Sequence, residues 1–204
     1  MKRMKLVVGL LAVAVLSAFY YVGNEPLAIG SKAPMSDVKM TDISGEQWSL
    51  DDLKKENGLL VVYSCNTCPF VIAWEDRYPE LGELCNTNNI GMALLNSNEA
   101  KRSGDDSMEA MKQHAKEKGY NTPYLLDENS AIANAMGART TPHVYLFDKN
   151  MELVYRGAID DNYKDASKVN ANYLEEAIKA LLDGKSIDPS ETKALGCSIK
   201  RVKS

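Results

Sequence analysis

The sequence contains few cysteines and no excess of positive charge, and each shortage excludes a class of protein. Four cysteines among 204 residues are too few for a scaffold held together by disulfides, so their positions matter more than their number. With 24 Lys and Arg against 28 Asp and Glu, the net charge is −4, which gives no reason to expect a nucleic-acid-binding face. Internal repeats and low-complexity tracts are also absent from the sequence, which excludes repeat (solenoid) proteins and linkers built from a few residue types.

What is present is an ordinary globular composition. Hydrophobic residues make up 45% of the chain and charged residues 25%, which excludes a disordered or fibrous protein. The length allows one domain with a large core or two small domains. The pattern along the chain therefore has to decide the architecture.

The first 22 residues have the pattern of an export signal. Three basic residues near the start precede the apolar run 6–22, which is slightly shorter than the ~20 residues that span a bilayer comfortably. The small residues needed for cleavage are only half matched, so residues 1–22 are either a signal peptide or a signal anchor that tethers the protein to the membrane. We expect the remaining chain to be exported to the periplasm or another extracytoplasmic, oxidising compartment.

After a linker over residues 23–34, the pattern predicts one α/β domain over 35–186 and a polar C-terminal tail over 187–204. Buried strands are expected at 59–63, 90–95 and 124–126, and a hairpin at 143–147 and 152–155. Helices are expected at 69–85, 105–118, 130–136 and 171–182. Alternating strands and helices followed by a late hairpin predict a mixed β-sheet covered by helices on both sides.

The strongest chemical signal is the sequence Cys65-Asn-Thr-Cys68-Pro69, between a predicted strand and a predicted helix. Two cysteines separated by two residues can close a disulfide, and a helix start favours thiolate over thiol. We expect Cys65 to attack a substrate and Cys68, one turn into the helix, to resolve the mixed disulfide. The alternatives are an inert structural disulfide or half of a zinc site, which would need a second close Cys or His pair.

A second element supports redox chemistry. In Thr141-Pro142 a proline stands at the start of a predicted strand, where it removes a hydrogen-bond donor. A cis bond there would bring this turn beside the dithiol and leave the Thr141 backbone free to pair with an extended substrate. Thr141 and Pro142 are therefore candidate substrate-binding residues, although a Thr-Pro pair alone is equally compatible with an ordinary trans turn.

The Cys-x-x-Cys sequence and the later Thr-Pro pair resemble those of the thioredoxin-fold redoxins. This family includes the alkyl hydroperoxide reductase/thiol-specific antioxidant-like proteins and related thioredoxins. The late Gly196-Cys-Ser-Ile-Lys200 is similar to a peroxiredoxin-like branch of that family. The resemblance implies a thioredoxin-like fold with an inserted strand–helix unit, here 90–118, and thiol–disulfide exchange through Cys65 and Cys68. It implies partner-protein thiols or disulfides and a separate thiol reductant as partners. No cofactor and no metal are expected.

Two other functions remain open on this resemblance. A thiol peroxidase of the family would carry Pro and Thr seven and three residues before its cysteine, and neither cysteine of the pair has them. A copper-binding metallochaperone of the Sco type would combine two thiolates with a histidine, and His143 follows Pro142 directly. The Sco proteins separate their cysteines by three residues rather than two.

The two remaining cysteines have different surroundings. Cys85 lies on an apolar helix face and is expected to be a small buried side chain. Cys197 lies in the polar tail among basic residues, which favour its thiolate, so it is a candidate accessory thiol that could exchange with the Cys65–Cys68 pair or bond to Cys85. His114 and Arg139 are expected to be solvated surface residues.

Overall fold

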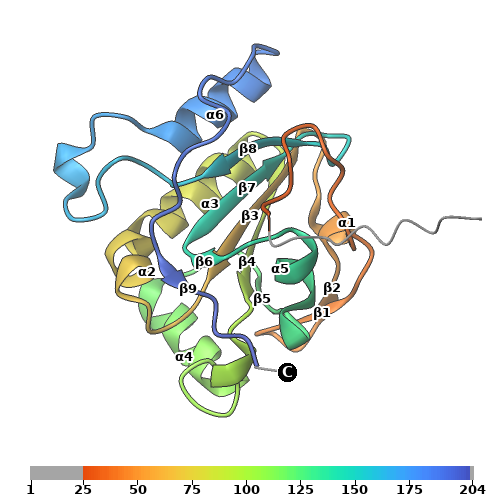
Figure 1. Ribbon diagram of the computed structural model, residues 1–204, viewed down its shortest axis with the longest axis vertical. Helices are drawn as coiled ribbons and strands as arrows, with labels where there is room; N and C mark the ends of the chain where they lie inside the picture. Colours follow the sequence, from red (N-terminus) through yellow and green to blue (C-terminus); the bar gives the residue numbers. More distant parts are fainter. Residues whose placement is uncertain (1–24, 203–204) are drawn as a thin grey trace, which may run out of the picture.

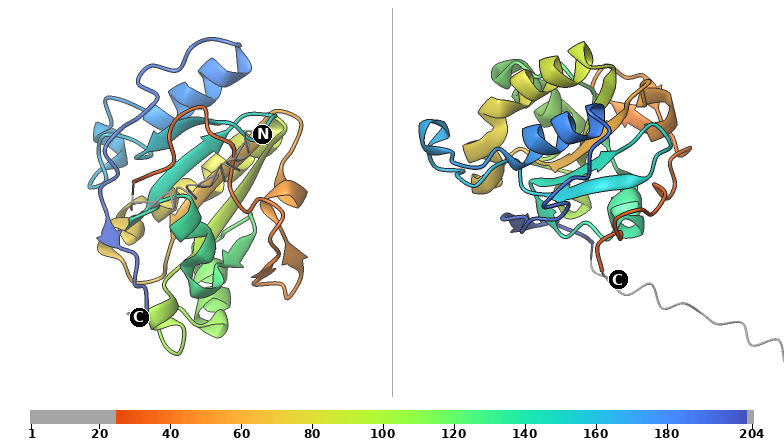
Figure 2. Two further views of the ribbon diagram at one scale, coloured as in Figure 1. Left: turned by 45° about the vertical axis from the view of Figure 1, so that its right-hand side comes forward. Right: turned by 90° about the horizontal axis from the view of Figure 1, so that it is seen from above.

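The computed structural model describes residues 25–202, and the predicted signal or anchor over residues 1–22 lies outside that range. Between residues 25 and 202, no helix is both long and apolar enough to cross a membrane. The described chain forms a mixed sheet with helices on both faces (Figures 1 and 2), which is the predicted architecture.

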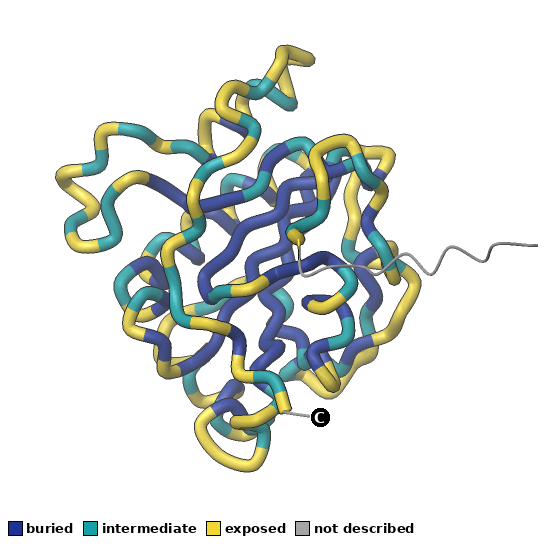
Figure 3. The backbone as a smooth tube through the Cα atoms, viewed as in Figure 1, coloured by how far each residue is buried: buried dark blue, intermediate teal, exposed yellow. Residues whose placement is uncertain are grey.

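Seven strands form the central sheet in the order β2-β1-β5-β4-β3-β7-β8. They are β1 (Met40–Asp42), β2 (Gln47–Trp48), β3 (Gly58–Ser64), β4 (Ile90–Asn96), β5 (Tyr124–Leu126), β7 (His143–Phe147) and β8 (Leu153–Gly157). The three central strands β3, β4 and β5 are parallel, and β7 pairs antiparallel with β3. The continuous apolar runs in β3 and β4 follow from this position, since both faces of these strands are buried (Figure 3).

The helices divide between the two faces of the sheet. They are α1 (Leu50–Leu53), α2 (Pro69–Trp74), α3 (Tyr78–Thr87), α4 (Met108–Lys118), α5 (Ala131–Ala135) and α6 (Tyr173–Leu182), with 3-10 turns η1 (Glu75–Arg77), η2 (Glu99–Lys101), η3 (Glu128–Ser130) and η4 (Ala166–Lys168). One core packs the sheet against α2, α3, α4 and α6, and the other packs it against α1 and α5. The inserted unit predicted over 90–118 is β4 and α4.

Two predicted helices differ from the observed ones. The helix expected over 69–85 is interrupted by η1 before α3 begins, with Pro79 in the first turn of α3. Proline has no backbone N–H to donate, which favours a new helix start over a continuous helix at this point. The helix expected from residue 105 begins only at Met108, because Ser107 caps it by accepting the Ala110 N–H.

The segments on either side of the predicted domain are attached to it. Within the predicted linker, Leu27 donates to the Met136 carbonyl and Ala33 to the Met151 carbonyl, so this part of the chain is not a free linker. At the other end, β9 (Cys197–Ser198) pairs antiparallel with β6 (Thr140–Thr141) and forms a second, two-stranded sheet (Figure 1). The polar tail is therefore a structural element, which its composition did not reveal.

Candidate active site

The two cysteines of the Cys-x-x-Cys sequence lie at the junction of β3 and α2. Cys65 follows the last residue of β3, and Cys68 is the N-cap of α2, with Pro69 as the first helical residue. The expectation that Cys68 lies one turn inside the helix is wrong, because the helix begins after it. The residue at the helix start, where backbone N–H groups are unpaired, is thus Cys68.

Thr141 brings the two thiols to one place. The Cys68 thiol donates to the Thr141 carbonyl oxygen over 3.0 Å, and the Cys65 sulfur lies 3.3 Å from the Thr141 hydroxyl. The Thr141–Pro142 peptide bond is cis, as the sequence suggested. The structure therefore places the Cys65–Cys68 pair next to the Thr141–Pro142 pair, although the two pairs are far apart in the sequence.

The surroundings of the two thiols shift their pKa values in opposite directions. The pKa of Cys68 is lowered, chiefly because the Cys65 thiol can donate a hydrogen bond to it; the Cys197 thiol and the Val71 backbone N–H act in the same direction, while burial opposes them. The pKa of Cys65 is raised, first because its proton is held in that bond and then because of burial. The Cys68 thiol that donates to Thr141 is the neutral form, so the lowered pKa means that Cys68 loses its proton before Cys65 does and then accepts a hydrogen bond from the Cys65 thiol.

A buried carboxylate holds the loop between the cysteines, and the sequence analysis missed it. Asp106 accepts the Asn66 backbone N–H over 2.9 Å and the side-chain amides of Asn96 and Asn98 over 2.8 and 2.9 Å. On its other side, the Asn66 side chain accepts the Tyr124 hydroxyl over 3.0 Å. These bonds fix the loop that places Cys65 and Cys68, and no spacing in the sequence connects residue 106 with residue 66.

The C-terminal strand lies over this site. Thr141 of β6 is the register partner of Cys197 in β9, and the Cys197 thiol interacts with that of Cys68. The expectation that basic neighbours favour the Cys197 thiolate is wrong, because burial and the hydrogen bond to Cys68 raise the pKa of Cys197 and outweigh the effect of Lys200. Both sulfurs of the pair are enclosed, since Cys65 is 2% and Cys68 4% exposed. In this conformation the dithiol is closed to solvent, and the tail pairs with the Thr141 edge that was expected to bind substrate.

His143 does not join the thiols. Its ring packs against that of Tyr145 at a tilt of 52°, with 4.6 Å between the ring centres, and Tyr145 belongs to the core on the α1 and α5 face. Cys65 and Cys68 belong to the core on the opposite face. Burial lowers the pKa of His143 to about 3, and within residues 25–202 no group of three or more Cys, His, Asp and Glu side chains has the geometry to hold a metal ion. The arrangement needed for a Sco-type copper site is therefore not formed.

The other candidate residues lie outside the thiol site and make structural contacts. Cys85 in α3 is fully buried, as expected, and desolvation raises the pKa of its thiol to about 12. His114 is not a solvated residue, since its Nε2 lies 2.7 Å from the buried carboxylate of Glu75. Arg139 lies at the surface and forms an ion pair with Glu25 over 3.0 Å.

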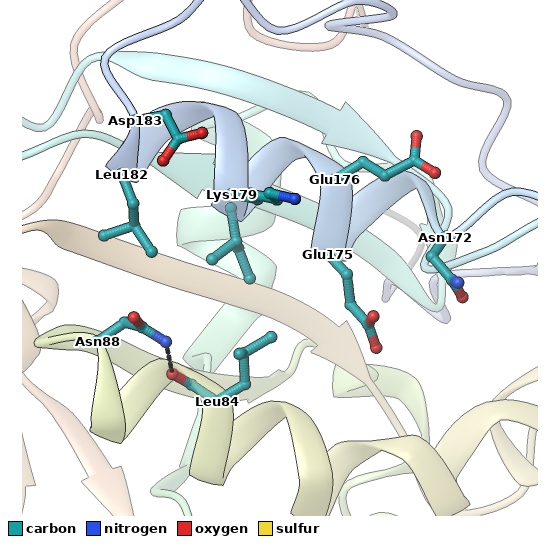
Figure 4. A pocket seen from close by; sticks show the side chains of 9 residues that line it. Leu84, Asn88, Asn172, Glu175, Glu176, Lys179, Leu182 and Asp183 are labelled. Atoms are coloured by element: carbon teal, nitrogen blue, oxygen red, sulfur yellow. Dashed lines mark hydrogen bonds between the residues drawn. The ribbon is translucent and has the colours of Figure 1, made fainter.

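A pocket elsewhere on the molecule has no part in this chemistry. It has a volume of about 510 Å³ and lies between α3 and α6, with Leu84 on one side and Leu182 on the other (Figure 4). None of its lining residues is a cysteine. The enclosed thiols beneath β9 are accordingly the candidate active site.

Comparison with known proteins agrees with the fold. The model of the AhpC/TSA family matches residues 29–156. An uncharacterized conserved protein from Geobacillus kaustophilus is 33% identical, with a TM-score of 0.81 over 87% of this chain and 94% of its own. A hypothetical protein from Sinorhizobium meliloti is 28% identical, with a TM-score of 0.80 over 88% of this chain and 98% of its own.

The fold extends to more distant structures. Peroxidoxin BcpB from Mycobacterium tuberculosis has a TM-score of 0.58 over 78% of this chain and 97% of its own, at 11% identity, which is a likeness of fold alone. No curated protein matches the chain.

Proposed function

This chain belongs to the AhpC/TSA family, a redoxin family with the thioredoxin-like fold, and from that premise we propose that it is a thiol–disulfide oxidoreductase acting on partner proteins. The observation that carries the proposal is the contact of both thiols of a Cys-x-x-Cys sequence with the single residue Thr141, next to a cis-proline. This arrangement places a nucleophilic thiol, a second thiol and a backbone edge that can pair with an extended client within one site.

In the proposed reaction Cys68, rather than Cys65, is the attacking thiol. Its thiolate attacks one sulfur of a client disulfide, forms a mixed disulfide and releases the other client sulfur as a thiolate. The Cys65 thiol then loses its proton and attacks the Cys68 sulfur, so that the client leaves with two thiols and Cys65–Cys68 is oxidised. Two electrons pass from the protein to the client, and the same steps in reverse oxidise a client.

The assignment to Cys68 rests on the local electrostatics. Cys68 is the N-cap of α2, and once deprotonated its sulfur accepts hydrogen bonds from the Cys65 and Cys197 thiols, both of which favour the thiolate. The bond from the neutral Cys68 thiol to the Thr141 carbonyl, which favours the thiol, is lost on ionisation. In the proposed reaction Cys65 keeps its proton in the first step, because that proton can be donated to the Cys68 thiolate, which raises the pKa of Cys65. The first thiol of the pair to ionise is thus the proposed nucleophile, and the other thiol resolves the mixed disulfide.

Export is part of the proposal and rests on the basic start and apolar run of residues 1–22. In an extracytoplasmic compartment a separate thiol reductant must return the Cys65–Cys68 disulfide to the dithiol. Clients are then exported proteins with disulfides, and a retained anchor would keep the domain near the membrane.

Reduction of insulin by the protein with dithiothreitol as electron source tests the activity. We expect the protein to accelerate insulin precipitation above the rate with dithiothreitol alone. A parallel assay follows hydrogen peroxide consumption with the same reductant. Peroxide turnover without insulin reduction would contradict the proposal and identify a peroxidase instead.

The lowered pKa of Cys68 predicts how its ionisation depends on pH. A thiolate absorbs at 240 nm, and the absorbance that Cys68 contributes is the difference between the reduced protein and its Cys68→Ser variant. Because the folded-state pKa is lowered, we expect this difference to persist as the pH falls from 8 to 6. A loss centred near the ordinary cysteine pKa of about 8.5 would contradict the predicted charge distribution.

A further inference from the structure

The edge that a client would use is occupied by the protein itself. Thr140 and Thr141 of β6 pair with Ser198 and Cys197 of β9, and Ile199 continues the pairing by donating to the Arg139 carbonyl over 2.9 Å. An extended segment with a cysteine opposite Thr141 is what a client disulfide would present to Cys68. The tail therefore binds in the manner of a substrate.

The tail is docked against the Thr141–Pro142 peptide without space between them. A Cβ added at Gly196 would clash with the Thr141 carbonyl oxygen, and this glycine has no positive φ that would itself require glycine. Close backbone approach is the reason that only glycine fits at position 196. The residue before Cys197 thus sets how near the tail comes to Cys68.

Contacts on both sides of Cys197 hold it in place. On the N-terminal side, the Thr192 hydroxyl is 2.8 Å from the Tyr155 hydroxyl and accepts the Ala158 N–H. On the C-terminal side, Ile199 is buried in the core on the α1 and α5 face, and Arg201 donates to the Ala138 carbonyl. Cys197 lies between these anchors with its thiol directed to that of Cys68.

From this placement we propose that Cys197 is a third redox thiol, which forms a disulfide with Cys68 and so competes with Cys65 to release the client. The inference rests on the proposed function, because the client disulfide is the oxidant. Tail and client use the same edge, so the tail leaves Thr141 when the client pairs there, and its return brings Cys197 onto the Cys68–client disulfide and displaces the client.

The step is balanced without any further reactant. The client sulfur is bonded to Cys68 after the first attack, and the Cys197 thiol gives up its proton to water and attacks the Cys68 sulfur as a thiolate. The Cys68–client bond breaks, the Cys68–Cys197 bond forms, and the client sulfur leaves as a thiolate that takes up a proton from water. The protein has lost two electrons and the client disulfide has gained them, as in the reaction through Cys65.

The test uses a variant in which only two cysteines remain. In the Cys65→Ser/Cys85→Ser protein, we expect oxidation with diamide to form a disulfide within the monomer between Cys68 and Cys197. Alkylation in denaturant followed by mass measurement would then find no free thiols, and peptide mapping would identify the bond. Two free thiols, or only disulfide-linked dimers, would overturn the inference. Cys65→Ala in place of Cys65→Ser provides a second variant in case the first does not fold.

A substitution at the glycine beside Cys197, compared with one at a distant glycine, tests whether the docked tail positions the thiol. In the two-cysteine protein, Gly196→Val is expected to slow formation of the internal disulfide at least about tenfold, because a displaced tail lowers the effective concentration of its thiol. Gly104→Ala should leave the rate unchanged, since the nearest atom to an added Cβ there is 4.0 Å away. Equal rates in the two proteins would overturn the docking argument.

Failure of the inference can be told apart from failure of the proposed function. A wild-type protein that reduces insulin, combined with a two-cysteine variant that keeps both thiols free, would remove Cys197 from the reaction and leave the Cys65–Cys68 pair in place. A wild-type protein that does not reduce insulin would overturn the proposed function itself.

Discussion

Replacing Cys68 with serine is expected to lower the rate of insulin reduction by on the order of 10³-fold or more, to the level of the uncatalysed reaction. Serine cannot supply a thiolate, and the hydrogen bonds that favour the charged form at position 68 have no sulfur to stabilise once Cys68 is replaced. The same replacement at Cys65 should preserve the first attack, since Cys65 holds the proton rather than the charge. The two rates are measured in parallel under the same reductant.

The comparison distinguishes the two assignments of the nucleophile. If Cys65→Ser loses all reaction with a client disulfide while Cys68→Ser accumulates a mixed disulfide, the attacking thiol is Cys65 and the order proposed here is wrong. Cys85→Ser is the matched control, because Cys85 is buried in α3 away from the site and should leave the rate unchanged.

Asp106→Ala is expected to destabilise the protein by on the order of 3–5 kcal/mol, because it leaves three donors without their acceptor. Asp106 is fully buried, so water does not replace the lost carboxylate without rearrangement of the loop. Such a loss is a large part of the stability of a typical domain and corresponds to a fall in melting temperature of roughly 10 °C. Thermal and urea unfolding measure it.

The neighbouring carboxylate is the control for this prediction. Asp105 has an exposed side chain, 3.6 Å from Lys101 in a surface ion pair, and only its backbone carbonyl contacts Asn66. We expect Asp105→Ala to change the stability by no more than about 1 kcal/mol. If the two substitutions have equal effects, Asp106 does not hold the loop. Asp106→Asn should be destabilising as well, because its amide would face the Asn98 amide, donor against donor.

Much of the fold could be predicted because its signals are local. Apolar runs identified β3 and β4, and the turn at residues 148–150 identified the hairpin of β7 and β8. Buried strands and helix faces must be apolar wherever the remaining chain lies, so their pattern is present in the sequence. The break between α2 and α3 was missed because the apolar pattern continues across it.

The candidate site was predicted in part for the same reason. Cys65, Cys68, Thr141 and Pro142 belong to short motifs with recognisable chemistry, and the structure brings them together. Asp106 was missed, because a single aspartate near the start of a helix resembles an ordinary surface residue until its three donors are located. Which cysteine carries the charge depends on hydrogen bonds made across the fold, and spacing does not contain that information.

The sequence by itself determined the redoxin-like α/β fold, the dithiol and the proline that adjoins it, since each is encoded by neighbouring residues. Only the tertiary structure decided that Cys68 is the helix cap, that His143 faces the opposite core, and that Cys197 lies over the site. These are contacts between residues far apart in the chain. Their energies depend on three-dimensional distance and burial, which a linear pattern does not specify.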